Sequence, residues 1–237
     1  MGRRRPSFGD PYAGVPGRRL FVAVPVPDEA AAEIAALVDD VRELDLPAGM
    51  RDVRWVRLEG AHLTLRFLGP TLDDRVDSAA AAVGAAAEGL APFDVAIEGA
   101  GRFPPHGRPR TLWLGVTDGA PELDVLAGAV SRHLEAAGWP QDDRPFRPHL
   151  TLARSDGLVA GPLVAERLAA AMAGRRIAFR ADRVVLFESL TGGGPARYVP
   201  LAATPLGPGA THGGDPDVYH PGTAQSGRTV RRDPTSS

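Results

Sequence analysis

The chain has 237 residues, of which 43% are hydrophobic and 24% charged, and its formal net charge at pH 7 is −2. A charge so close to balance argues against the strongly basic surface of a protein that binds duplex nucleic acid. Cysteine is absent, which excludes disulfides, thiol nucleophiles and thiolate metal sites, and no apolar segment approaches the length of a membrane span, so we expect a cytoplasmic protein.

Both ends of the chain have the composition of disordered segments. Residues 1–18 are rich in Arg, Gly and Pro, and residues 206–237 mix Gly, Pro, Thr, Ser and Asp without apolar periodicity. The N-terminal arginines are not followed by an apolar run, so this end does not resemble a signal peptide. We therefore expect one folded domain over residues 19–205, a disordered basic extension over 1–18 and a disordered tail over 206–237.

The central part of the chain mixes β-rich runs with amphipathic helical patterns. Strands are predicted over residues 20–26, 62–68, 93–97, 111–116 and 149–154, near 177–187 and over 197–201. Apolar residues at helical spacing predict helices over residues 34–44, 76–90, 123–134 and 163–172. Because hairpin-like strand pairs interrupt the helices, this order favours an α+β fold with antiparallel sheets over a doubly wound nucleotide-binding fold.

The tetrapeptide His-Leu-Thr-Leu occurs twice, once from His62 and once from His149, and each copy lies in a predicted strand. Side chains alternate between the two faces of a strand, so His62 and Thr64 share one face, as do His149 and Thr151. The intervening leucines would point into the core. If the two polar faces meet, two imidazoles and two hydroxyls converge.

Two imidazoles and two hydroxyls suit phosphoryl chemistry without a metal or another cofactor. Histidine titrates near neutral pH, so one ring can accept a proton while the other donates one. Threonine hydroxyls can hydrogen-bond the non-bridging oxygens of a phosphate. A cyclic phosphodiester contains its own leaving oxygen, which water can displace from the opposite side. A metal site is disfavoured, because neither copy carries a further Asp, Glu or His at ligand-like spacing.

The motifs resemble those of the RNA 2′,3′-cyclic phosphodiesterases, also called 2′-5′ RNA ligases, of the 2H phosphoesterase superfamily. The matching stretches are RLFVAVPV at 19–26, HLTLRFLG at 62–69, TLWLGV at 111–116, FRPHLTLAR at 146–154, and FES and ARY at 187–189 and 196–198. The resemblance implies a bilobal 2H phosphoesterase fold, with two pseudo-symmetric lobes of antiparallel sheet, helices outside and a central cleft. It also implies metal-independent hydrolysis of a 2′,3′-cyclic phosphate to a 2′-phosphate end.

The resemblance further implies roles for individual residues. His62 would be the proton donor to the leaving 3′ oxygen, and His149 the proton acceptor that activates water. Thr64 and Thr151 would hold phosphate oxygens. Five residues after each histidine, Phe67 and Arg154 match family positions associated with base stacking and with phosphate or substrate contact. Strict alternation would turn both of these side chains away from the histidines, so each strand should end, twist or bulge there.

The expected substrates are RNA with a 2′,3′-cyclic phosphate terminus or small cyclic nucleotides, and we expect a monomer that does not contact membranes. The reverse reaction, ATP-independent 2′-5′ RNA ligation, is the alternative within the same chemistry. Hydrolysis is favoured, because water is far more concentrated than any RNA end and no feature of the sequence would exclude it. A non-catalytic module that binds RNA ends is the alternative from a different functional class.

Overall fold

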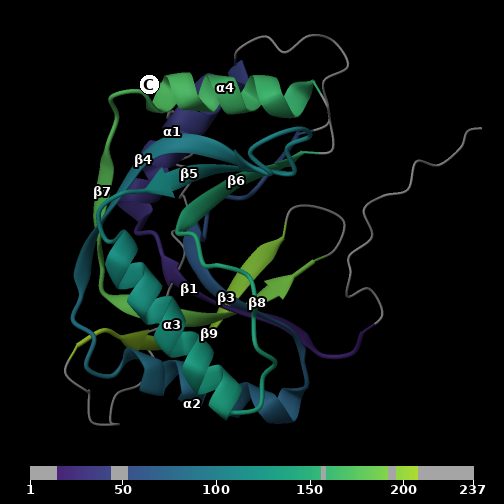
Figure 1. Ribbon diagram of the computed structural model, residues 1–237, viewed down its shortest axis with the longest axis vertical. Coiled ribbons are helices and arrows are strands. Elements are labelled where there is room, and N and C mark those ends of the chain that lie inside the picture. Colours follow the sequence, from purple (N-terminus) through teal and green to yellow (C-terminus); the bar gives the residue numbers. More distant parts are fainter. Residues whose placement is uncertain (1–14, 44–52, 156–158, 192–195, 208–237) are drawn as a thin grey trace, which may run out of the picture.

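Two β-sheets lie face to face in the computed structural model, and helices cover their outer sides (Figure 1). The structure describes residues 15–43, 53–155, 159–191 and 196–207. Every pair of neighbouring strands in the two described sheets is antiparallel. The α+β class with two antiparallel sheets, predicted from the mixed order of strands and helices, is therefore confirmed.

The first sheet has the strand order β3-β1-β8-β9. Its strands are β1 (Arg18–Pro25), β3 (His62–Thr71), β8 (Arg183–Leu190) and β9 (Arg197–Pro205). The second sheet has the order β2-β6-β5-β4-β7. Its strands are β2 (Val53–Trp55), β4 (Phe93–Phe103), β5 (Thr111–Val116), β6 (His149–Ser155) and β7 (Ile177–Ala181).

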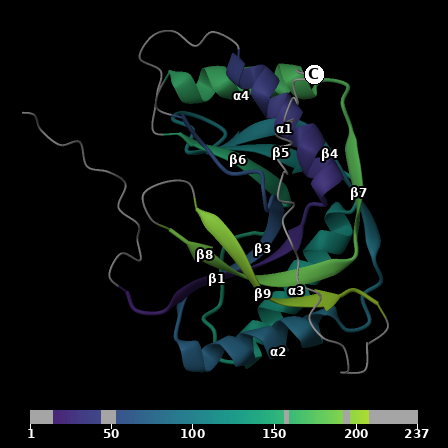
Figure 2. The same ribbon diagram turned by 180° about the vertical axis from the view of Figure 1, so that it is seen from behind.

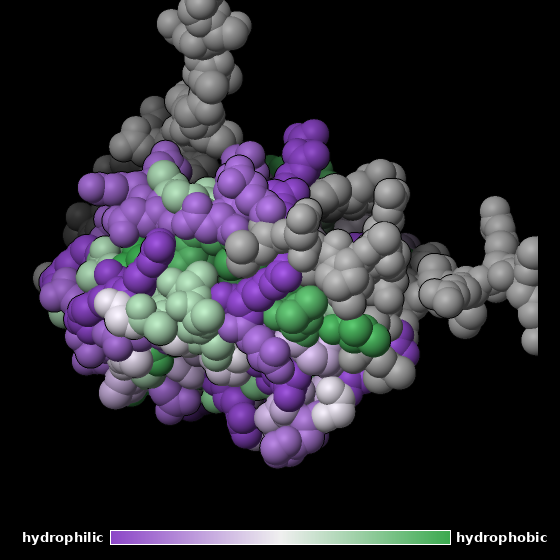
Figure 3. All heavy atoms as spheres, turned by 90° about the horizontal axis from the view of Figure 1, so that it is seen from above, coloured by the Kyte–Doolittle hydropathy of each residue, from purple (hydrophilic) through white to green (hydrophobic). Residues whose placement is uncertain are grey.

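Each sheet is covered by a different pair of helices. The helices are α1 (Asp28–Glu43), α2 (Val76–Ala87), α3 (Ala120–Ala136) and α4 (Ala160–Met172), and a short 3-10 helix, η1 (Asp73–Arg75), precedes α2. Helices α2 and α3 pack on the first sheet, whereas α1 and α4 lie over the second (Figure 1). Seen from above, over α1 and α4, the surface is largely hydrophilic with smaller apolar patches between the polar residues (Figure 3). Helices α1 and α4 therefore pack one face against the sheet and expose the other face to solvent, as the spacing of their apolar residues predicts.

The leucines of the two repeats anchor their strands in the main hydrophobic core. Leu63 and Leu65 are 0% and 7% exposed, and Leu150 and Leu152 are 2% and 1% exposed. Burying one leucine side chain contributes about 1.5–3 kcal/mol to the free energy of unfolding. The predicted inward orientation of these leucines is confirmed, and it leaves the opposite face of each strand to the polar residues.

Two features of the sheets differ from the strand prediction. The edge strand β2 was not predicted, because three residues are too few to show an alternating pattern. The run predicted near residues 177–187 contributes to two strands, β7 and β8, which belong to different sheets. Figure 2 shows the chain passing from one sheet to the other along one side of the molecule.

The predicted disordered ends lie mostly outside the described residues, as does Leu44 at the end of the first predicted helix. Within the described part, Arg18 already pairs with Thr71 in the first sheet. At the other end, Leu206 is only 5% exposed and its backbone N–H donates to the Asp182 carbonyl at 2.7 Å. The described chain thus continues beyond both ends of the predicted domain, as far as Gly207, which forms a β-bridge with Glu88. Disorder of the remaining parts of the extensions stays a prediction.

Candidate active site

A β-bulge in β3 places His62, Thr64 and Phe67 on the same face of the first sheet. Their partners in the neighbouring strand are alternate residues: Pro25, Ala23 and Phe21. Paired residues of an antiparallel ladder share a face, and so do alternate residues of one strand. The register shifts between Thr64 and Arg66, which leaves Leu65 as the extra residue. Because of this extra residue, the Phe67 side chain lies on the same face as His62, although five positions separate the two residues and regular alternation would place them on opposite faces.

The second repeat contains a bulge at the equivalent position of β6. His149, Thr151 and Arg154 pair with alternate residues of β5: Gly115, Trp113 and Thr111. The register shifts beside Leu152, so this leucine is the counterpart of Leu65. In both strands the first six residues follow one burial pattern, with the histidine and threonine half-buried and the sixth residue exposed. The predicted irregularity after each histidine is confirmed as a bulge.

The His62 ring is fixed on several sides. Its Nδ1 lies 2.8 Å from the Gly60 carbonyl oxygen, and because a carbonyl only accepts, Nδ1 carries the proton. The ring of Phe21 lies 4.8 Å away between centroids, and the ring of Tyr198 meets it edge-on at 4.7 Å. Burial among these rings lowers the pKa of His62 below its ordinary value of 6.5, and the hydrogen bond to Gly60 offsets part of this effect.

His149 is held in the same way by its own strand. Its Nδ1 lies 2.6 Å from the carbonyl oxygen of Arg147, which, like Gly60 before His62, stands two residues before the histidine. The Phe103 ring meets His149 edge-on at 5.1 Å, and the Trp113 ring lies 6.2 Å away. Burial lowers the pKa of His149, the bond to Arg147 opposes this, and the positive charge of Arg154 lowers it further. Both histidines therefore present Nε2 as their reactive nitrogen.

The two polar faces come together between the sheets. Strand β3 of the first sheet contacts β6 of the second, and these strands carry the two repeats. Tyr198, in β9 of the first sheet, also interacts electrostatically with Arg154 in β6. Burial raises the pKa of Tyr198, while the positive charges of Arg154 and Arg19 oppose that rise. All six residues predicted for the site thus lie on the two polar strand faces.

Phe67 and Arg154 differ in how the protein holds them. Phe67 is 52% exposed and its ring lies 6.0 Å from that of Phe21. Arg154 is exposed in part, yet its Nη1 donates to the Thr111 hydroxyl at 2.5 Å, and burial lowers its pKa. An exposed aromatic ring suits stacking with a base, and a fixed guanidinium suits an anion.

Tyr198 was given no role from the sequence, although it lies in the ARY stretch. Its ring contacts both His62 and Phe21, and its hydroxyl interacts with a charge on the other sheet. Trp113 likewise borders His149 without having been singled out. Strand alternation alone does not reveal either contact, because both depend on which strands become neighbours.

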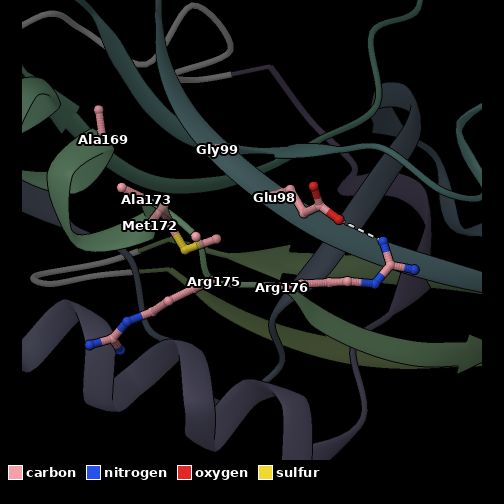
Figure 4. A pocket seen from close by; sticks show the side chains of 8 residues that line it. Glu98, Gly99, Ala169, Met172, Ala173, Arg175 and Arg176 are labelled. Atoms are coloured by element: carbon pink, nitrogen blue, oxygen red, sulfur yellow. Dashed lines mark hydrogen bonds and ion pairs between the residues drawn. The ribbon is translucent and has the colours of Figure 1, made fainter.

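Two surface hollows lie away from the histidines. One, of about 290 Å³, lies between β4 and the end of α4, where Glu98 pairs with Arg176 at 2.5 Å (Figure 4). The other, of about 550 Å³, lies between α1 and the segment from Trp55 to Gly60. Neither hollow contains a histidine or a threonine of the repeats. Among the described residues no three His, Asp or Glu side chains group as metal ligands would, and no helix is long and apolar enough to cross a membrane.

Comparisons with known proteins point to one family. The 2′-5′ RNA ligase superfamily matches residues 21–193. An RNA 2′,3′-cyclic phosphodiesterase of Geobacillus stearothermophilus is 33% identical over 186 residues, and one of Archaeoglobus fulgidus is 32% identical over 136 residues. The first alignment covers 78% of this chain and 56% of the Geobacillus protein. The second covers 57% of this chain and 72% of the Archaeoglobus protein. The chain thus matches little more than half the length of the Geobacillus protein.

Solved structures agree with the sequence relatives. The crystal structure of Escherichia coli LigT complexed with 3′-AMP has a TM-score of 0.63 and 25% identity, covering 80% of this chain and 98% of that chain. A protein of Thermus thermophilus, TT0787, has a TM-score of 0.61 and 26% identity over 79% of this chain and 97% of that chain. The 2H phosphoesterase fold implied by the motifs is therefore confirmed for this chain, with its two antiparallel sheets and four helices in the described residues.

Proposed function

The chain belongs to the 2′-5′ RNA ligase superfamily, and we propose that it hydrolyses 2′,3′-cyclic phosphodiesters at RNA ends to 2′-phosphates. The observation that carries this proposal is the duplicated polar face: two strands with the same bulge each present a histidine and a threonine, and the strands touch between the sheets. Relatives named RNA 2′,3′-cyclic phosphodiesterase support the same reaction.

In the proposed mechanism, the two Nε2 atoms flank the phosphorus. Water attacks the phosphorus and gives a proton to Nε2 of His149. The bond between the phosphorus and the 3′ oxygen breaks, and that oxygen takes a proton from His62. The role of His149 as base is supported by Arg154, whose positive charge disfavours protonated His149. A bound phosphate is negatively charged and would raise the pKa of His62, which favours its protonated form as the acid.

The remaining proposed site residues bind the substrate. Thr64 and Thr151 are half-buried on the same faces as their histidines, where their hydroxyls can donate to the two non-bridging oxygens. These donors stabilise the negative charge that grows on the phosphate in the transition state. Phe67 offers an exposed ring for base stacking, and Arg154 a guanidinium held by Thr111. Action on small cyclic nucleotides, a monomeric state and a cytoplasmic location stay predictions.

The test uses an oligonucleotide that ends in a 2′,3′-cyclic phosphate, incubated with the protein and a chelator. Wild type should release a 2′-phosphate end, and His62→Ala and His149→Ala should each lower kcat by about 10²–10⁴-fold, the usual contribution of a general acid or base. His133→Ala is the matched control, because His133 is exposed on α3. Full activity of either active-site variant would refute the mechanism. Binding of the oligonucleotide by wild type without turnover would favour a non-catalytic module.

A further inference from the structure

Arg66 is a buried arginine that the proposed mechanism does not use. It follows the first repeat directly and is 5% exposed, and among the described arginines it is the only buried one. The bulge at Leu65 turns its side chain away from the polar face, because Arg66 pairs with Val22 of the main core. In the second repeat the equivalent residue is Ala153, which is 0% exposed. The first repeat therefore carries a guanidinium into the interior where the second carries a methyl group.

The Arg66 guanidinium holds the end of α3 and the residues that follow it. Its Nη1 donates to Oε1 of Glu135 at 3.1 Å, and its Nη2 donates to the Pro140 carbonyl. Burying a guanidinium is costly unless its donors are paired, so these two contacts fix the position of the side chain. Arg75 of η1 contacts the same stretch, since its guanidinium lies 3.9 Å from the centroid of the Trp139 ring. Two arginines from the first half of the chain therefore hold the start of the segment that leads to the second repeat.

This segment, residues 139–148, connects the first sheet to the second histidine. It forms neither helix nor strand. It runs from the end of α3, which packs on the first sheet, to β6 in the second sheet (Figure 1). Strands β3 and β6 belong to different sheets, so no ladder of backbone hydrogen bonds fixes His149 relative to His62. Near its end the segment supplies the Arg147 carbonyl that accepts from Nδ1 of His149. The position of the second imidazole therefore depends on how this segment is held.

We propose that Arg66 is a positioning residue: by holding Pro140 it sets the path of residues 139–148 and so aligns the second histidine with the first. Its effect on catalysis rests on the proposed function, in which both imidazoles must reach one phosphorus. Pro140 stands nine positions before the second histidine, and β3 contacts β6 directly, so a contact from β3 to this segment limits where β6 begins. The influence of Arg66 extends further along the segment. The pKa of Asp142 is lowered mainly by its hydrogen bond from Arg144 and additionally by the positive charge of Arg66.

The experiment measures kcat on an oligonucleotide that ends in a 2′,3′-cyclic phosphate, at a temperature at which circular dichroism shows each variant folded. Arg66→Met keeps an unbranched apolar stem but removes both donors, and its kcat should fall about 10–10²-fold, because a misplacement of about 1 Å can cost about 10²-fold in rate. Glu135→Gln is the matched control. It removes the ion pair but keeps an oxygen acceptor for Nη1 and the contact to Pro140, so its kcat should equal that of wild type.

A distance measurement gives a second readout that does not depend on turnover. The chain has no cysteine, so nitroxide labels can be attached at Ser78→Cys on α2 and Asp143→Cys in the segment, two exposed positions. The distance distribution from pulsed electron paramagnetic resonance should shift or broaden in Arg66→Met and match wild type in Glu135→Gln. An unchanged distribution in Arg66→Met, whatever its kcat, would overturn the positioning role.

Arg66→Lys tests the same point if Arg66→Met does not fold. Lysine retains the charge but lacks the planar fork that serves Glu135 and Pro140 together, so its kcat and its distance distribution should both depart from wild type, though less than those of Arg66→Met. A wild-type distance distribution in Arg66→Lys would likewise overturn the proposal. If wild type hydrolyses no cyclic phosphate, the proposed function fails, but a changed distance distribution in Arg66→Met would still support the alignment by Arg66.

Discussion

Replacing Gly101 with alanine should displace the Trp113 ring that borders His149. Gly101 and Trp113 are partners across β4 and β5, and the indole lies over the glycine. A Cβ added at Gly101 would lie 2.9 Å from Cε2 of Trp113 and closer still to two other ring atoms. Overpacking of this kind costs about 1–3 kcal/mol of the free energy of unfolding. For a chain of this size that cost lowers Tm by roughly 2–12 °C.

The same substitution should also lower catalytic activity. The centroids of Trp113 and His149 are 6.2 Å apart, so a shifted indole changes the surface against which the imidazole packs. A misplacement of about 1 Å can cost about 10²-fold in rate. We therefore expect kcat on a cyclic-phosphate oligonucleotide to fall by about 10–10²-fold, while the hydrogen bond from His149 to Arg147 still limits how far the ring can turn.

Urea unfolding followed by circular dichroism measures the change in the free energy of unfolding, and initial rates at temperatures below Tm measure the change in kcat. Gly84→Ala is the matched control. Gly84 lies within α2, and a Cβ there would meet only the Thr204 hydroxyl at 3.9 Å, an ordinary contact. This control should stabilise the protein by about 0.5–1 kcal/mol, because glycine is unfavourable inside a helix. If Gly101→Ala unfolds at the wild-type urea concentration and keeps its kcat, the packing argument is wrong.

Two further predictions concern the titration and packing of the histidines. The pKa values of His62 and His149 are both lowered from 6.5. The pH profile of kcat/KM should be bell-shaped, because activity falls below the pKa of the base and above the pKa of the acid, and its maximum should lie below pH 6.5. A maximum above about pH 7.5 would contradict this assignment. Tyr198→Phe keeps the aromatic ring against His62 and should retain kcat within about threefold of wild type. Tyr198→Ala removes the ring and should lower kcat by about tenfold or more. Equal kcat values for the two variants would exclude a positioning role for the ring.

Much of the fold follows from local patterns. The predicted strand over residues 111–116 matches β5, and the helical stripes correspond to α1, α2, α3 and α4. The resemblance to the family places Phe67 and Arg154 at the site, and their odd offsets from the histidines therefore predict an irregular strand in both repeats. What the sequence does not show is the form of that irregularity. A bulge at Leu65 or Leu152 is defined only by the register against a neighbouring strand.

The order of residues by itself determined most of the helices and strands, the inward leucines and the two polar faces, because alternation and helical spacing act over a few residues. Only the tertiary structure decided which of those faces meet. Arg54 is about 100 positions from Arg154 in the chain yet pairs with it in the sheet, and Tyr198 in the first sheet interacts electrostatically with Arg154 in the second. Such neighbours follow from long-range strand pairing and burial, which depend on the whole core rather than on any local sequence pattern.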